Sequence, residues 1–338
     1  MIVPRPAVGA VLVALAVLVA GALAACGSSG SDSDALTLYS GRIAPILSPA
    51  VEQYETASGT DVKVRYGDSP SLAAQIAEEG KNSPADVFFA QDAGSLDAVE
   101  QQGLLAPLPA DVLALVPKRF QSVAGRWVGV TGRSRIIAYG PKVKRSELPD
   151  SPLKLTDPKW RARVGWAPTN ASLQGYVTAL RLIEGEDVAK QWLEGMVANK
   201  TQAYDSNIPV RDAIAEGEID LGLMNHYYVA EALAEDPSYP VKAHFPPKDL
   251  GSLVNVAGVG VLASSEHKPE ALAFVRTMLS NKAQAYFADS SKEYPLLGGV
   301  RPPKELRPLE DIPSPKIDLA KLGDLAGTLK LMRETGAL

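Results

Sequence analysis

Residues 36–80 read LTLYSGRIAPILSPAVEQYETASGTDVKVRYGDSPSLAAQIAEEG, and this stretch decides the fold class. An apolar strand is predicted over 36–39, and a helix over 43–57 follows it after a short turn. The pattern then repeats, because residues 62–66 alternate as a strand and residues 69–79 form a second helical segment. Two strand–helix units in succession predict an α/β fold with mainly parallel sheets.

The same alternation continues through the rest of the chain. Each further strand is short and apolar, and the helices after them begin at polar residues that can cap a first turn. Roughly 300 residues beyond the N-terminal segment suffice for two compact lobes. The further predicted strands are 86–90, 164–167 and 219–224, and the further helices are 93–102, 171–183 and 225–235.

The first 25 residues have the pattern of an export signal. Arg5 precedes an apolar run over 7–25, which ends in LAAC at 23–26. This ending resembles the lipobox of bacterial lipoproteins, and the resemblance implies that Cys26 becomes a lipidated N-terminus that anchors an extracytoplasmic protein to the cell membrane. Residues 26–35 are then a flexible polar tether. Cys26 is the single cysteine, so the folded part has no internal disulfide.

Composition and motifs argue against several classes of function. The formal net charge is −5 with no basic stripe, which argues against nucleic acid as a partner. No G-x-S-x-G, H-E-x-x-H or phosphate-binding loop occurs, so the chain is not expected to be an enzyme. Residues 258–263 match the G-x-G-x-x-A dinucleotide pattern, but they lie inside an apolar run and are interpreted as a core strand.

Polar and phenolic side chains follow the predicted strands. In open α/β sheets ligands bind beyond the carboxyl ends of the strands, where helix N-termini present unpaired amides. The chain places five groups of residues there: Ser40-Gly41-Arg42, Gln91-Asp92, Thr169-Asn170-Ala171-Ser172, Asn207 and Asn225-His226-Tyr227-Tyr228.

The neighbouring tyrosines Tyr227 and Tyr228 are the most distinctive of these residues. Adjacent residues of a regular helix point about 100° apart, so both phenols can reach one centre only in an irregular first turn, with Asn225 as the N-cap. A phenol ionises near pH 10, so binding as phenolate needs a hard, highly charged cation such as ferric iron. An aromatic stack on an organic ligand, or two half-buried helix residues, are the alternative interpretations.

A second device favours anions. Asn170 stands at a predicted helix start, and the small residues Ala171 and Ser172 leave space for a ligand to approach the first-turn amides. An ordinary helix cap explains the same residues.

Six short motifs, in order over most of the chain, resemble those of the ferric-ion-binding proteins of iron ABC importers. They are PADVFF (84–89), TGRSR (131–135), PKW (158–160), EGE (216–218), MNHYY (224–228) and EYPL (293–296). The resemblance implies a two-lobed periplasmic-binding-protein fold of type II with a hinge. It also implies a role outside the cytoplasm, with an ABC permease and its ATPase as partners, and a monomer is expected.

The resemblance also implies a site. Its cargo would be Fe(III), with carbonate, phosphate or citrate as the synergistic anion. Tyr227 and Tyr228 would coordinate the iron. The anion would be bound by Asn170, Ala171, Ser172, Asn207 and Asn225, with its charge balanced by Arg133.

Two positions depart from that family. Many members carry a histidine ligand where this chain has Ile43, and a glutamate ligand where it has Gln91. Three interpretations remain: Asp92 replaces the missing carboxylate beside Gln91, Arg42 helps to hold a larger anion that completes the iron shell, or the protein binds no bare iron. In the last case the same fold binds an organic or oxyanion solute such as a polyamine, thiamine, a phosphonate or a sugar phosphate.

The chain is expected to cross between lobes near Arg133 and again near Ala257. The first lobe is then predicted to contain residues 36–133 and 258–310, and the second residues 134–257 and 311–338.

Overall fold

A computed structural model describes residues 35–319 and 322–338. The predicted export signal over 1–25, Cys26 and the tether up to residue 34 lie outside the described residues, so their roles stay predictions. Within the described ranges, no helix is both long enough and apolar enough to span a bilayer.

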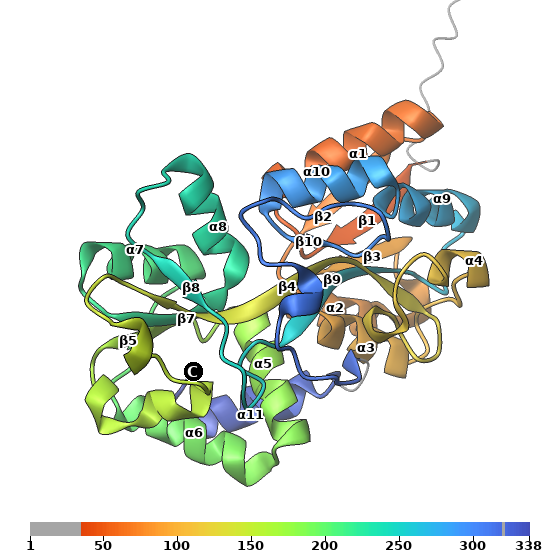
Figure 1. Ribbon diagram of the computed structural model, residues 1–338. Coiled ribbons are helices and arrows are strands. Elements are labelled where there is room, and N and C mark those ends of the chain that lie inside the picture. Colours follow the sequence, from red (N-terminus) through yellow and green to blue (C-terminus); the bar gives the residue numbers. More distant parts are fainter. Residues whose placement is uncertain (1–34, 320–321) are drawn as a thin grey trace, which may run out of the picture. The chain divides into compact units, whose positions relative to one another are not determined.

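The strands of the described chain join in one mixed sheet (Figure 1). Its order is β2-β1-β3-β9-β4-β7-β5-β6, and β8 and β10 each pair with β4. The strands are β1 (Leu36–Ser40), β2 (Val62–Tyr66), β3 (Val87–Ala90), β4 (Trp127–Tyr139), β5 (Val164–Trp166), β6 (Gln202–Ala203), β7 (Leu221–Asn225), β8 (Lys242–His244), β9 (Val254–Val261) and β10 (Tyr294–Pro295).

Helices cover both faces of this sheet (Figure 1). They are α1 (Ala44–Ser58), α2 (Ser69–Glu79), α3 (Ala93–Gln101), α4 (Ala110–Leu113), α5 (Ala171–Ile183), α6 (Glu186–Ala198), α7 (Asn207–Glu216), α8 (His226–Glu235), α9 (Lys268–Met278), α10 (Asn281–Ser291) and α11 (Leu325–Glu334). The predicted α/β class is confirmed, and the predicted helices over 69–79 and 171–183 are found with the same ends.

Helix α1 shows why the sequence folds this way locally. Its buried residues Leu47, Ala50, Val51 and Tyr54 recur at the spacing of one helical face, which packs into the main apolar core. Gly59 ends the helix with φ 73°, a left-handed conformation that glycine adopts without a steric penalty.

The middle of the sheet is antiparallel, which corrects the expectation of mainly parallel sheets. The β1 strand pairs with β2 and β3 in parallel, as does β5 with β6 and β7, but β9 runs antiparallel to both β3 and β4. Apolar runs such as residues 258–263 do not reveal strand direction. Their interpretation as a core strand is confirmed for Gly258–Val261, which lie in buried β9.

The 13-residue strand β4 joins the two halves of the sheet. Up to Ser134 it pairs with β9, and from Arg135 onward it pairs with β7 and β8. This change of partners lies one residue beyond Arg133, where the sequence predicts the first crossing. The lobe boundaries themselves stay predictions.

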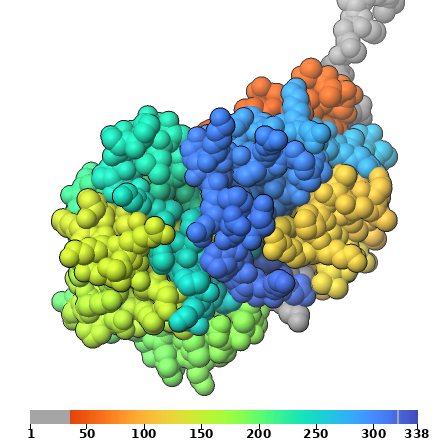
Figure 2. Space-filling view, viewed as in Figure 1, coloured from red at the N-terminus to blue at the C-terminus, as the bar shows by residue number. Residues whose placement is uncertain are grey.

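The C-terminal segment returns to both halves. Helix α11 packs on α5, where the hydroxyls of Thr178 and Thr328 lie 2.7 Å apart and Arg181 pairs with Asp324 at 3.0 Å. Before it, the Val254 amide donates to the Ser314 hydroxyl at 3.0 Å. Figure 2 shows the chain after β10, in dark blue, crossing the visible face between the yellow and the teal segments.

Candidate metal and anion site

The two tyrosine hydroxyls converge at the start of α8. Asn225 precedes the helix in an extended conformation, so Tyr227 and Tyr228 occupy its first turn. The Tyr227 hydroxyl donates to the Tyr228 hydroxyl at 3.2 Å, and the ring centres lie 4.3 Å apart with planes inclined by 39°. Neighbouring tyrosines can therefore present both oxygens to one centre.

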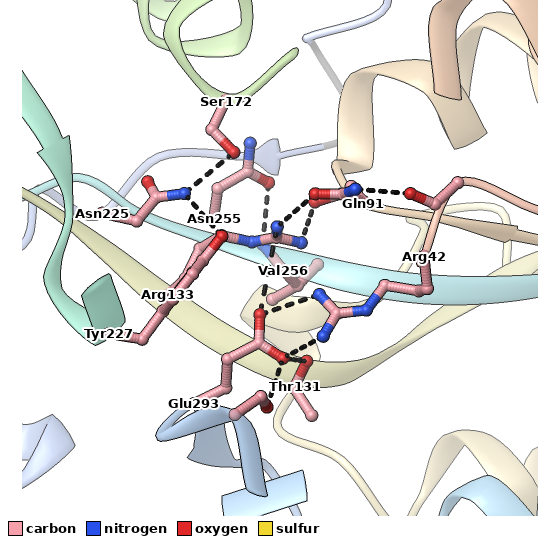
Figure 3. Close-up of polar contacts among 12 residues, drawn as sticks. Arg42, Gln91, Thr131, Arg133, Ser172, Asn225, Tyr227, Asn255, Val256 and Glu293 are labelled. Atoms are coloured by element: carbon pink, nitrogen blue, oxygen red, sulfur yellow. Dashed lines mark hydrogen bonds and ion pairs between the residues drawn. The ribbon is translucent and has the colours of Figure 1, made fainter. Parts of the chain in front are cut away.

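Asn225 stands at the predicted cap position but uses its side chain differently. No side-chain capping bond forms. The amide nitrogen of Asn225 instead donates to the Tyr227 hydroxyl at 3.3 Å and to the Ser172 hydroxyl at 3.1 Å (Figure 3). This amide thus links the tyrosine pair to the first turn of α5.

The start of α5 is built as an ordinary cap that also faces the tyrosine pair. The Asn170 carboxamide oxygen accepts from the Ser172 amide at 3.1 Å, as an N-cap does. Ser172 is buried and Ala171 is partly exposed. The amides of this first turn still favour negative charge, because the helix dipole points its positive end there.

Asn207 lies in the first turn of α7 and is not its cap. The helix begins at Asn207 itself, and Ser206 takes the cap position. The Asn207 side chain is fully buried beside the Tyr228 phenol, and neither of its amide atoms has a hydrogen bond of good geometry among the described residues. We call Tyr227, Tyr228, Ser172, Asn207 and Asn225 the tyrosine cluster.

The side chains of Gln91 and Asp92 both have hydrogen-bond partners within the first half of the chain. Gln91 donates from its side-chain amide to the Gly41 carbonyl and accepts from Arg133. Both carboxylate oxygens of Asp92 accept from Ser95, one from its amide at 2.8 Å and one from its hydroxyl at 2.9 Å. Asp92 is therefore the cap of α3, and burial raises the pKa of its carboxyl.

Arg42 and Arg133 are held by a buried carboxylate. The Arg42 guanidinium donates twice to Glu293, at 2.9 and 2.7 Å, while Arg133 lies 4.0 Å from the same carboxylate (Figure 3). Glu293 also accepts from Thr131 at 2.9 Å. Burial opposes the charge on Glu293, but the two arginines outweigh it and lower the pKa of the carboxyl. We call Arg42, Arg133, Glu293 and Gln91 the arginine cluster.

The two clusters influence each other electrostatically. Burial and the neighbouring Tyr227 raise the pKa of Tyr228 well above its ordinary value, while Asn207 and Arg133 partly offset this rise. The phenol is therefore neutral without a ligand, and only a strongly polarising cation can displace its proton near neutral pH. Tyr227 and Tyr228 also interact electrostatically with the guanidinium of Arg42, so this arginine lies near the tyrosine pair.

Sequence reasoning missed two residues here. Glu293 was noticed only as part of a motif, and Arg135 was not singled out. His226, between Asn225 and Tyr227, has its partners elsewhere: its Nδ1 accepts from the Ser134 amide at 3.2 Å, its Nε2 donates to the Lys292 carbonyl at 3.0 Å, and its ring stacks on Tyr294. Burial lowers the pKa of His226 to about 4.

Comparison with known proteins identifies the family to which this chain belongs. The family model described as bacterial extracellular solute-binding protein matches residues 36–290. The chain belongs to this family. The resemblance inferred from the six motifs is confirmed by curated relatives. A Fe(3+)-binding periplasmic protein of Serratia marcescens is 33% identical over 330 residues, covering 96% of this chain and 97% of that protein. The major ferric iron-binding protein of Neisseria meningitidis serogroup B is 31% identical over 325 residues, covering 94% and 97%.

Solved structures agree with the two-lobed fold of this solute-binding family. Iron-bound HitA from Pseudomonas aeruginosa superposes with a TM-score of 0.84 at 35% identity, covering 89% of this chain and 99% of that one. A Trichodesmium protein described as IdiA or FutA, in complex with iron and citrate, gives a TM-score of 0.77 at 30% identity, with coverages of 89% and 99%.

Proposed function

We propose that this solute-binding protein captures ferric iron through Tyr227 and Tyr228, together with a small oxyanion, outside the cytoplasm. The observation that carries the proposal is the 3.2 Å approach of the two phenol oxygens, in surroundings that keep Tyr228 protonated until a strong cation arrives. In the described parts of the chain, no group of three or more histidine, cysteine or acidic side chains could hold a metal. A phenolate site is consistent with that composition.

The count of donors favours iron accompanied by an anion. A six-coordinate ferric ion receives two oxygens from the tyrosines, while Asp92 caps α3 and Ile43 has no donor atom. Of the three interpretations of the departures at Ile43 and Gln91, an anion that completes the iron shell agrees best with these contacts, although Arg42, which was expected to help hold it, is paired with Glu293. Carbonate, phosphate and citrate all qualify, and a solved relative is described as holding iron and citrate.

An organic cargo without iron is less well supported. The two rings lie against each other at 4.3 Å, so they do not form a slot for a flat ligand between them. The relatives named for iron also cover nearly the whole chain.

Delivery follows from the family. The protein would pass its cargo to an ABC permease driven by an ATPase, acting as a monomer. Lipid attachment at Cys26 would keep it at the membrane, and mass spectrometry of the mature N-terminus tests that attachment.

The proposed cargo has a simple optical test. Apo protein mixed with ferric citrate should develop the orange to red charge-transfer band of iron bound to phenolate. Tyr227→Phe and Tyr228→Phe should each weaken the band, whereas the exposed Tyr66→Phe serves as a matched control and should leave it unchanged. A colourless wild-type sample, or a band that survives both substitutions, would reject the proposal.

A further inference from the structure

The C-terminal segment connects two helices whose first turns lie at the site. Helix α3 begins after its cap Asp92 and packs on β3 and β9, in the first half of the sheet. Helix α5 begins after Asn170 and packs on β7, in the second half. Helix α11 packs on α5 (Figure 1) and also contacts α3. We call Leu322, Gly323 and Asp324, which precede α11, the clasp.

The first two residues of the clasp lie tightly against α3. A Cβ atom at Gly94 would overlap the Leu322 carbonyl oxygen, and one at Gly323 would overlap the Asp97 carboxylate. Asp97 is also hydrogen-bonded to the Gly323 backbone, and Leu322 is buried in the main apolar core. Neither glycine has a positive φ, so these two positions require glycine for close packing.

The third residue of the clasp is held by α5. One carboxylate oxygen of Asp324 caps α11 by accepting from the Gly327 amide at 3.0 Å, and the other accepts from Arg181 of α5 at 3.0 Å. Arg181 also donates to the Asp324 carbonyl at 3.1 Å and to the Thr328 hydroxyl at 3.0 Å. The start of α11 is therefore fixed to the second half of the sheet.

The chain passes from one half to the other between two consecutive residues. Gly323 contacts α3, and Asp324 is bound to α5. Consecutive Cα atoms are about 3.8 Å apart, and a single peptide unit cannot stretch. The two helices cannot move apart at this point unless the clasp leaves either α3 or α5.

Binding proteins with two lobes close around their ligands by a hinge motion. We infer that the clasp limits how far the two halves separate beside α3 and α5, and that it thereby slows the loss of bound cargo. Strands β4 and β9 connect the halves within the sheet, and the clasp connects them outside it. The inference deepens the proposed function and rests on it for the nature of the cargo, but its effect on the shape of the protein needs no iron.

The first experiment measures small-angle X-ray scattering of the metal-free protein. Arg181→Gln weakens the attachment to α5, and Gly94→Ala pushes the Leu322 backbone away from α3. Each variant should have a larger radius of gyration than wild type. The double variant should expand no further than the more expanded single variant, because a connection broken at one end transmits nothing from the other.

Each substitution has a matched control. Arg276→Gln breaks an ion pair of 2.6 Å with Asp111, which joins α9 to α4 and takes no part in the clasp. Gly298→Ala adds a methyl group where no atom lies within 4 Å. Both controls should scatter as wild type does. Asp324→Asn retains a residue that caps helices well but loses the charged pair, so it replaces any clasp variant that circular dichroism shows to be unfolded.

The second experiment times iron release from loaded protein to a competing chelator. Arg181→Gln and Gly94→Ala should release iron roughly 2- to 30-fold faster than wild type, the range expected when coupling between distant sites is altered. The charge-transfer band of the loaded protein should keep its position, because neither substitution changes a tyrosine.

The outcomes separate the inference from the iron proposal. Folded clasp variants with the scattering of wild type would overturn the inference, and so would expansions that add in the double variant. Expanded variants that release iron at the wild-type rate would show that the clasp does not retain cargo, which also contradicts it. If wild type never shows the phenolate band, the iron proposal fails, while scattering of the metal-free variants still decides whether the clasp restrains the halves.

Discussion

The tyrosine cluster and the arginine cluster interact electrostatically, yet their polar groups differ in the partners that they find within the protein. In the arginine cluster Glu293 accepts two hydrogen bonds from Arg42 and lies 4.0 Å from Arg133, and Gln91 is bonded at both ends of its amide. The tyrosine cluster instead contains a raised phenol pKa and a buried Asn207 without good partners within the described ranges, with Arg135 beside it. From this difference we expect the ligand to bind at the tyrosine cluster, while the Glu293 carboxylate holds the arginines of the other cluster in place.

The largest effect on iron affinity is expected from a substitution in the tyrosine cluster. Tyr228→Phe removes an anionic iron ligand. Changes to residues outside the ligand shell typically lower metal affinity by roughly 10- to 100-fold, so we expect a larger loss of iron affinity for this variant. Gln91→Ala in the arginine cluster should change it by less than about tenfold. Competition with a calibrated chelator measures both affinities. Equal losses for the two variants would abolish the distinction between the clusters.

The next largest effect is expected on stability, from a substitution in the arginine cluster. Glu293→Gln leaves Arg42 buried without its counter-charge, which should lower the free energy of unfolding by about 3–5 kcal/mol. Urea denaturation of the metal-free protein measures this loss. The double variant Arg42→Met with Glu293→Gln should recover part of it, because the uncompensated charge is gone. No recovery would show that the pair is not the cause.

A third prediction concerns the pH dependence of stability through His226, which accepts a hydrogen bond from the Ser134 amide of β4. His226 has a folded-state pKa of about 4, below its ordinary value near 6.5. Its contribution to stability is therefore complete above about pH 6.5 and is lost as the pH falls toward 4, by up to about 3 kcal/mol. His226→Gln should flatten the stability profile between those pH values. An unchanged slope would show that another group titrates there.

The smallest effect sharpens the role of Asp92. As the cap of α3, Asp92→Ala should cost about 1 kcal/mol of stability and leave iron affinity within about tenfold of wild type. Ser95→Ala removes one of the two bonds to the same carboxylate and is the matched control. A loss of iron affinity as large as that of Tyr228→Phe would instead make Asp92 an iron ligand.

Local signals explain how much the sequence could predict. Helix α2 was predicted with its observed ends because Pro70 suits a first turn and Gly80 ends a helix. The tyrosine pair was found because two phenols after a buried strand are unusual. The antiparallel pairing of β4 with β9 was missed, since strand direction depends on contacts between residues more than 100 positions apart.

Side-chain partners were the harder part. Asp92 is followed three residues later by Ser95, a cap pattern that explains its carboxylate without a metal. Arg135 lies on β4 two residues after Arg133, and only the structure shows that Glu293 pairs with Arg42, while Arg135 has no carboxylate partner in the described chain. Such pairings join distant segments, so periodicity and spacing do not reveal them.

The central claim, that Tyr227 and Tyr228 hold ferric iron as phenolates, is tested most directly by resonance Raman spectroscopy of iron-loaded protein. Excitation within the charge-transfer band should enhance the ring vibrations of coordinated phenolate in wild type. The Tyr227→Phe, Tyr228→Phe double variant should lose them. Stoichiometric iron binding in wild type without phenolate vibrations, or their persistence in the double variant, would contradict the account.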